Sequence, residues 1–188
     1  MTAPDGFAVC FSGHRQKKLP SEPLQRVLQS ILLDEIQTAI RDGASIFYSG
    51  LATGIDLMAA ETVLTQRLLH PQIRLIGVKP FAKQNESLSG ALAARCQTVE
   101  TAADQVICIS PHYHRGCYRL RNQYMIDHSE RLIAVVSDMH SGTGQTIRMA
   151  QKRGISLRII DIKQLESLLL PEAQAQSAFE TPTIRKEF

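Results

Sequence analysis

The chain is poor in the residues that mark several common classes of protein. It has no tryptophan, and aromatic residues make up only 5% of its 188 residues. We therefore expect no aromatic platform of the kind that stacks single-stranded nucleic acid. The net charge of +3 is mild; it permits an anionic small ligand but does not indicate a nucleic-acid-binding protein. Together these features argue against nucleic acid as a partner.

Signals for export or membrane insertion are also missing. No apolar run approaches the roughly 20 residues that cross a bilayer. The first residues, MTAPDGFAVCFSGHR, lack a basic start followed by a long apolar run. The four cysteines contain no Cys-x-x-Cys pair, and we expect them to be reduced. The sequence therefore predicts a cytoplasmic protein with no membrane partner.

Two common nucleotide-binding signatures are absent as well. No Gly-Lys-Ser/Thr occurs anywhere in the chain, which disfavours ATP hydrolysis of the P-loop kind. The full Gly-x-Gly-x-x-Gly with an acidic residue about 20 positions later, which marks dinucleotide-binding folds, does not occur either. The sequence therefore leaves the cofactor, if there is one, unknown.

What the chain does contain is a regular alternation of short apolar runs and longer helical patterns. The predicted strands are 7–13, 45–50, 73–78, 105–110, 131–137 and 157–162, and the predicted helices are 23–43, 55–69, 85–103, 116–129 and 143–154. This order predicts an α/β, Rossmann-like, doubly wound and mainly parallel sheet of about six strands with helices on both faces. We expect one domain over 1–170 and a loosely held C-terminal tail over 171–188.

Glycine and hydroxyl residues gather where a ligand is expected in such a sheet, just after the strands. We predict one phosphate-binding nest in SGLATGID (49–56) and another in SGTGQT (141–146), because glycine allows close approach and helix N-termini attract anions. The residues concerned are Ser49, Gly50, Thr53 and Gly54 in the first, and Ser141, Gly142, Thr143, Gly144 and Thr146 in the second. The first stretch also has a purely structural interpretation, as a tight turn with Thr53 and Asp56 capping the helix.

Basic residues lie near these turns. His14 and Arg15 follow the first predicted strand, either as a solvated pair or as ligands, with Arg15 forking onto a phosphate. Arg115, Arg119 and Arg121 crowd the start of the helix predicted at 116–129; Arg121 and Asn122 fall beside the expected site. A further group, His112, His114 and Cys117, resembles metal-ligand spacing, but without a second cluster a loop of unligated histidines is the favoured interpretation.

Four motifs in order, FSGHR, YSGLATGID, RNQYMIDHSERLIAV and SGTGQTIRMA, together resemble the YpsA-like family of the SLOG superfamily over about residues 7 to 162. The resemblance implies a Rossmann-like SLOG fold and kinship with the DNA-processing protein DprA and with the LOG phosphoribohydrolases. It places pocket residues at Ser12, Gly13, His14, Arg15, Ser49, Gly50, Gly54, Asp56, Arg121, Asn122, Asp127, Gly142, Thr143, Gln145 and Thr146. Ser141 stands where the family commonly has the first glycine of Gly-Gly-Thr.

The chain lacks one essential residue of the LOG enzymes. Their motif, Pro-Gly-Gly-x-Gly-Thr-x-x-Glu, ends in the glutamate that cleaves the N-glycosidic bond. Nothing acidic falls between Ser141 and Gln151, so that mechanism cannot be transferred. Asp56 is the obvious remaining carboxylate at the strand ends.

The function that the sequence favours is binding or sensing of a nucleotide or nucleotide-derived small molecule at the strand ends. The alternative is a hydrolase of a nucleotide N-glycosidic or phosphate bond, with Asp56 as the acid/base. A DprA-like single-stranded DNA-binding role is the lesser alternative. SLOG relatives often pair, and the apolar LESLLL (165–170) could supply a contact between two copies of the chain.

Overall fold

The computed structural model describes residues 6–169, and the helices and strands lie close to their predicted positions. The strands are β1 (Phe7–Gly13), β2 (Ala44–Ser49), β3 (Arg74–Lys79), β4 (Gln105–Cys108), β5 (Arg131–Val136) and β6 (Ser156–Asp161). The helices are α1 (Glu22–Arg41), α2 (Ile55–Arg67), α3 (Gly90–Ala102), α4 (Cys117–Asp127) and α5 (Gly142–Arg153), with a 3-10 turn, η1 (Gln16–Lys18), after β1. The predicted tail at 171–188 and the last residue of LESLLL lie outside the described residues.

The strands form one parallel sheet in the order β4-β3-β2-β1-β5-β6. The chain winds outward from β1 to β4 and then returns to the other side of β1 with β5. The doubly wound α/β fold predicted from the sequence is therefore correct. Its topological switch point lies between β1 and β5, where ligands of such sheets bind at the carboxyl ends of the strands.

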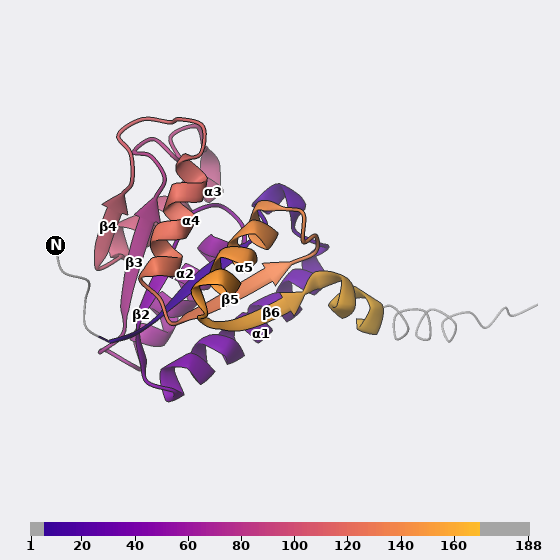
Figure 1. The fold of residues 1–188 in the computed structure, drawn as a ribbon. Helices are drawn as coiled ribbons and strands as arrows, with labels where there is room; N and C mark the ends of the chain where they lie inside the picture. The colour runs from indigo at the N-terminus through magenta and orange to yellow at the C-terminus, as the bar shows by residue number, and fades with distance from the viewer. Residues whose placement is uncertain (1–5, 170–188) are drawn as a thin grey trace, which may run out of the picture.

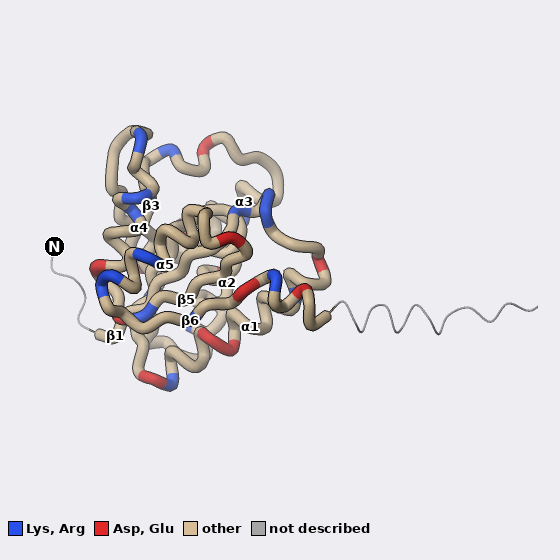
Figure 2. Tube along the Cα trace, turned by 45° about the vertical axis from the view of Figure 1, so that its right-hand side comes forward, with Lys and Arg blue, Asp and Glu red and all other residues tan. Residues whose placement is uncertain are grey.

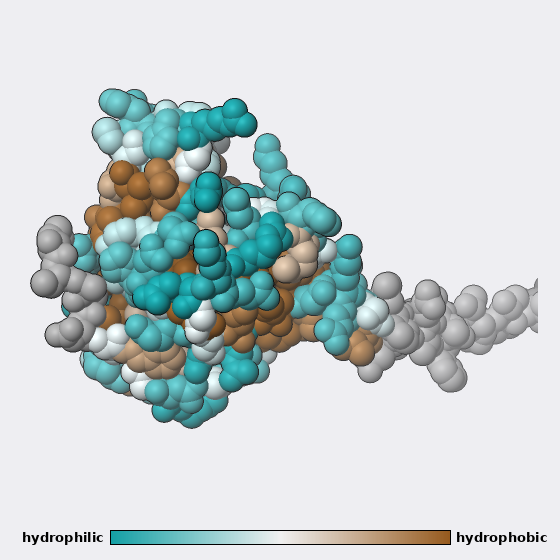
Figure 3. Space-filling view, in the orientation of Figure 1, coloured by the Kyte–Doolittle hydropathy of each residue, from teal (hydrophilic) through white to brown (hydrophobic). Residues whose placement is uncertain are grey.

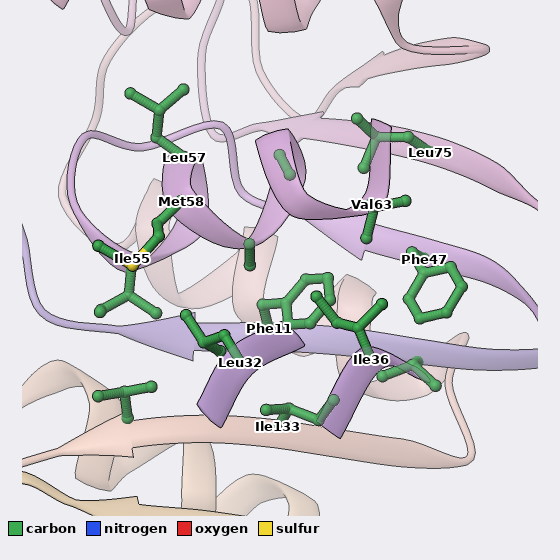
Figure 4. Packing of buried hydrophobic residues seen from close by; sticks show 14 of the residues in the cluster. Phe11, Leu32, Ile36, Phe47, Ile55, Leu57, Met58, Val63, Leu75 and Ile133 are labelled. Carbon is green, nitrogen blue, oxygen red and sulfur yellow. The ribbon is translucent and has the colours of Figure 1, made fainter. Parts of the chain in front are cut away.

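Helices cover both faces of the sheet (Figure 1). On one face, α1, α2 and α3 pack on side chains that include Phe11 of β1 and Phe47 of β2, whose rings stack 6.1 Å apart (Figure 4). On the other face, α4 and α5 pack on a second cluster through Met125, Ile126 and Ile147. Fully buried central strands account for the near-continuous apolar runs in the sequence.

The helices bury the stripes that the sequence pattern predicts. Along α1, Leu24, Leu28, Leu32 and Ile36 recur every fourth residue and are all buried. Helix α2 is buried on most of its sides, because it contacts α1, α3 and the sheet. Residues 6–169 contain no helix that is both long and apolar enough to cross a membrane.

All but one of the predicted boundaries lie within two residues of the observed ones, and the exception is the start of the third helix. The helix predicted from residue 85 begins at Gly90, after Ser89 in extended conformation as the N-cap residue, so that turns occupy 80–89. The strand predicted over 105–110 ends at Cys108. β4 and β6 are also more exposed than the central strands, because each lies at an edge of the sheet.

Candidate functional site: a cleft at the switch point of the sheet

A cleft of about 420 Å³ lies at the carboxyl ends of β1 and β5, where the topology predicts a ligand site. Its walls come from the segment after β1, the start of α2, helix α4 and the first turn of α5. The lining residues are Phe11, Ser12, Gly13, His14, Arg15, Lys17, Lys18, Asp56, Tyr118, Arg121, Asn122, Ser141, Gly142 and Thr143.

His14 links the end of β1 to the turns that follow β2 and β5. Its carbonyl accepts a hydrogen bond from the Ile55 N–H at 3.1 Å, and its Nε2 accepts one from the Ser137 N–H at 2.8 Å. An Nε2 that accepts from a backbone amide carries no proton, which places the ring proton on Nδ1. Burial lowers the pKa of His14, and Lys18 lowers it further, while Asp138 opposes the shift. The imidazole is therefore neutral at neutral pH.

Cations and an aromatic ring form the wall next to η1. The Arg15 guanidinium lies over the Tyr118 ring, 5.1 Å from its centroid, and Lys17 and Lys18 follow it in η1. Among residues 6–169, none of these three cations forms an ion pair. The wall therefore offers unneutralised positive charge to the cleft.

Three aromatic side chains gather behind this wall, although the sequence predicts no aromatic platform. Phe81 meets Tyr113 and Tyr118 edge-to-face, with ring centroids 5.5 and 6.0 Å apart. Phe81 comes from the loop after β3, Tyr113 from the loop after β4 and Tyr118 from the first turn of α4, so only the fold brings them together. Tyr113 is 66% exposed. This is a local aromatic cluster in a chain whose overall aromatic content is low.

The first turn of α5 forms the opposite wall and is open. Ser141 caps the helix: its Oγ accepts from the Gly144 N–H at 3.3 Å, and its carbonyl accepts from the Gln145 N–H at 3.0 Å. The N–H groups of Gly142 and Thr143 belong to the four that a helix leaves without internal partners. A Cβ added at Gly142 would meet no atom within 4 Å. The turn is therefore of the kind that attracts anions at helix N-termini.

A buried ion pair lies in the cleft opposite these open groups. Arg121 Nη1 donates to Asp56 Oδ2 at 3.1 Å, and both side chains are less than 8% exposed. Burial lowers the pKa of Arg121, and the attraction of Asp56 opposes that shift. The Arg121 Nε is buried and has no hydrogen-bond partner among the described residues. The guanidinium occupies the space above Gly50 that a side chain there would need.

The turn that follows β2 is filled by the protein itself. Ser49 is fully buried; its hydroxyl donates to the Asp56 carbonyl at 2.9 Å and accepts from the Leu51 N–H. Gly54 has a φ of 98°, and its Cα lies against the backbone of His14 and Arg15. Neither residue lines the cleft. These contacts hold α2 against β1 and leave Asp56 as the part of SGLATGID that reaches the cleft.

The structure brings together ten of the predicted site residues and separates the rest. Those lining the cleft are Ser12, Gly13, His14, Arg15, Asp56, Arg121, Asn122, Ser141, Gly142 and Thr143; those outside its lining are Ser49, Gly50, Thr53, Gly54, Asp127, Gly144, Gln145 and Thr146. Thr146 is buried and accepts from Asn122 Nδ2 at 2.8 Å, whereas Gln145 lines a separate groove. Their contact with a ligand stays a prediction.

Sequence reasoning missed four lining residues: Phe11, Lys17, Lys18 and Tyr118. Lys17 and Lys18 directly follow the SGHR motif, so their position after β1 was a usable signal. Tyr118 enters one residue into α4, and nothing in the local pattern distinguishes it from a solvated tyrosine.

Two other features do not form a competing site. A larger hollow of about 620 Å³ lies beside α3 and β4, but its Lys79 is already paired with Glu100 at 2.7 Å. Within residues 6–169, no three His, Cys, Asp or Glu side chains are arranged to hold a metal ion. Cys117 is buried, while His112 and His114 are exposed. The switch-point cleft is therefore the best-supported candidate.

Comparison with known families agrees with this arrangement. The model of the YpsA family, described as the YspA SLOG family, matches residues 9–165. The chain belongs to the YpsA family of SLOG proteins. Its relatives include a UPF0398 protein of Halalkalibacterium halodurans, 28% identical over 63% of this chain and 65% of that one. The uncharacterised SPbeta prophage-derived protein YoqJ of Bacillus subtilis is 28% identical over 69% of this chain and 84% of that one.

Solved structures place this YpsA-family fold beside DNA processing protein A. The Helicobacter pylori protein, described for its single-stranded DNA binding mode, has a TM-score of 0.57 at 21% identity, covering 89% of this chain and 73% of its own. The Streptococcus pneumoniae protein has a TM-score of 0.56 at 16% identity, covering 81% of this chain and 50% of its own. At these identities the likeness concerns the fold.

Proposed function

We propose that this YpsA-family protein binds a nucleotide or nucleotide-derived ligand in the switch-point cleft. The observation that carries the proposal is the meeting of two phosphate-attracting features there. The unpaired cations Arg15, Lys17 and Lys18 share the cleft with the open first turn of α5. A phosphate placed between them accepts from the N–H groups of Gly142 and Thr143 and is neutralised by the Arg15 guanidinium.

Groups suited to a nucleoside lie beside this phosphate position. Tyr118 and the guanidinium stacked on it offer a flat surface for a base. Asn122 donates its Nδ2 to Thr146, which leaves its carbonyl oxygen free to accept from a base or a ribose. Asp56 Oδ1 is the other acceptor, because Oδ2 is bonded to Arg121. These acceptors favour a nucleotide over inorganic phosphate alone.

Hydrolysis with Asp56 as the acid/base has weaker support. Asp56 is the only carboxylate among the lining residues, and one of its oxygens is held by a buried guanidinium. His14 is neutral and its Nε2 is engaged by Ser137. A general acid needs a transferable proton within reach of the leaving group. The one lining carboxylate is instead held in an ion pair with the buried Arg121. The alternative predicts base or phosphate release that disappears in Asp56→Asn while binding persists.

Single-stranded DNA is the other candidate, because the Helicobacter pylori structural neighbour is described by its binding of that polymer. The unpaired cations of the cleft and the cluster of Phe81, Tyr113 and Tyr118 are compatible with it. The cleft itself, at about 420 Å³, is of the size of a small-molecule site. We therefore retain the mononucleotide as the first choice.

Calorimetry with nucleosides, nucleoside mono- and diphosphates and inorganic phosphate tests the proposal. We expect at least one nucleotide to bind more tightly than about 1 mM, or about −4 kcal/mol, and the matching nucleoside to bind more weakly. Arg15→Gln should weaken the nucleotide roughly 10- to 100-fold, the value of a lost charge-assisted hydrogen bond. Arg41→Gln, an exposed cation on α1, is the matched control and should change nothing. If no nucleotide binds below the millimolar range, the proposal is wrong.

A further inference from the structure

A second basic surface lies outside the cleft, in a groove between α4 and α5. The groove has a volume of about 410 Å³. Its lining residues are Arg119, Gln123, Gln145, Arg148, Met149, Lys152 and Arg153. Four of these carry positive charge and none carries negative charge. Figure 2 shows Lys and Arg positions gathered around these two helices.

The groove cations are unpaired within the described residues, as are the three cations of the cleft wall, whereas several other cations pair with carboxylates. Arg67, Arg95 and Arg131 each lie within 2.8 Å of a carboxylate. Among residues 6–169, none of the four groove cations forms an ion pair. Lys152 and Arg153 also stabilise the C-terminal end of α5, where the helix dipole favours cations.

The helix dipole does not account for the other two cations. Arg119 lies in the first turn of α4, near a helix N-terminus, where a positive charge is unfavourable. Arg148 lies in the middle of α5, where its Nη1 donates to the Met139 carbonyl at 2.7 Å. This bond orders the Arg148 side chain without neutralising its charge. A partner that brings negative charge would offset both.

The groove and the switch-point cleft have walls made by the same two helices. Helix α4 supplies Tyr118 and Arg121 to the cleft and Arg119 to the groove. Helix α5 likewise supplies Thr143 to the cleft and Arg148 to the groove. The hydrogen bond from Asn122 to Thr146 joins the two helices. Unpaired positive charge therefore lies on two sides of these helices, in the cleft at Arg15, Lys17 and Lys18 and in the groove at its four cations.

We propose that the α4–α5 groove binds the phosphodiester backbone of a single-stranded nucleic acid. Three of its four cations are arginines, whose planar guanidinium groups fork onto phosphate oxygens. Arg148 and Lys152 are about one helical turn, roughly 6 Å, apart along α5, so that they can contact successive phosphates of an extended strand. The proposal adds a site to the one in the cleft and holds whether or not the cleft binds a nucleotide.

Other anionic partners fit the groove less well. An acidic peptide gains most of its affinity from buried apolar or aromatic anchors, and Met149 is the one apolar residue in the lining. A membrane surface favours helices that present bulky apolar side chains beside the basic ones. The groove lining is instead charged or amide apart from Met149, and Figure 3 shows hydrophilic residues at the centre of the α4–α5 face with hydrophobic ones at its edges. A concave groove between helices also suits one strand better than a convex duplex.

Fluorescence anisotropy with a labelled oligothymidylate is the test, with salt varied from about 50 to about 200 mM. The groove variant is Arg119→Glu with Lys152→Glu; both side chains are exposed and neither lines the cleft. We expect it to bind at least 10-fold more weakly than the parent at the lowest salt. The slope of log affinity against log salt should fall by about 1.4, since each lost single-strand phosphate contact contributes about 0.7.

A control variant with two substitutions on the opposite face of the sheet has the same net charge as the groove variant. Arg26→Glu with Arg41→Glu reverses two α1 cations that form no ion pair among the described residues. This pair should bind the oligonucleotide nearly as tightly as the parent, within about 3-fold, because the remaining effect is screened long-range charge. An equal loss in both pairs overturns the proposal, as does the absence of salt-dependent binding by the parent.

Two further titrations test which partner the groove binds and whether it acts apart from the cleft. Tighter binding of duplex DNA, or equal competition by poly-glutamate, would contradict a single-strand backbone site. Nucleotide calorimetry of the groove variant should match the parent, because Arg119 and Lys152 do not line the cleft. If the groove variant loses oligonucleotide binding but keeps nucleotide binding, the result supports the groove site. The cleft proposal is tested separately by nucleotide binding of Arg15→Gln.

Discussion

The turns after β2 and β5 have nearly the same composition but different surroundings. SGLATGID and SGTGQT each place serine, glycine and threonine at or before the start of the helix that follows a buried strand. In the first, Gly50 lies under the Arg121 guanidinium and Ser49 is bonded inside the turn. In the second, Gly142 faces open space and two helix N–H groups have no internal partner.

The difference comes from where each turn lies in the sheet. The β5 turn is at the switch point, where the connections on either side lead away from each other and leave a crevice. The β2 turn lies one strand further from it, and α2 packs back so closely that Gly54 contacts the backbone of His14. The same residue types therefore serve packing in one turn and are available to a ligand in the other.

Removing the charge at the β2 turn should have the largest effect on stability. Asp56→Ala leaves the Arg121 guanidinium buried without its partner, and we expect a loss of about 3–5 kcal/mol in the free energy of unfolding, measured by urea denaturation. Asp56→Asn with Arg121→Met removes both charges and should restore most of that loss. A double variant as unstable as Asp56→Ala would show that the pair is not the cause.

A comparison of two glycines addresses the turns directly. The Cβ of Gly50→Ala would overlap the Arg121 guanidinium, which cannot move without breaking its bond to Asp56. We expect a loss of about 1–3 kcal/mol, the usual cost of overpacking. Gly142→Ala has free space and should change stability by no more than about 0.5 kcal/mol. Urea denaturation of both variants measures the contrast, and equal losses would contradict it.

The arrangement of strands and helices around these two turns was predictable from the sequence. Their order follows from apolar runs and amphipathic stripes, so the parallel sheet and its ligand edge could be derived without tertiary information. The stripe of Leu24, Leu28 and Leu32 on α1 is one such pattern, because its spacing alone identifies the buried face of the helix.

Which glycine turn stays open was not predictable from local sequence. It depends on the Arg121 side chain crossing to Asp56, a contact between residues 65 positions apart. The aromatic cluster of Phe81, Tyr113 and Tyr118 arises in the same way, from two loops and the start of α4 that only the fold brings together. Periodicity and turn chemistry describe near neighbours in the chain, whereas these contacts are set by the packing of α4 on the sheet.

His14 contacts both turns. Its protonation should have the smallest effect on the free energy of unfolding, because that effect appears only at acid pH. The carbonyl bond to Ile55 does not titrate, but protonation of Nε2 removes the acceptor of the Ser137 N–H. The pKa of His14 is lowered in the fold by burial and by Lys18, with Asp138 opposing, so the unfolded chain binds more protons. The free energy of unfolding should therefore fall as pH drops below about 6.5 and level off below the lowered pKa.

His14→Gln keeps an acceptor for Ser137 but does not titrate, so its stability should depend less on pH than that of the parent. Urea denaturation between about pH 7.5 and about pH 5 measures the two curves, which should converge toward the acid end. Lys18→Met removes the second cause of the lowered His14 pKa. It should therefore narrow the pH range over which the free energy of unfolding falls. Parallel curves for parent and His14→Gln would mean that protonation of His14 costs the fold nothing. The bond to Ser137 would then not be what holds the β5 turn against β1.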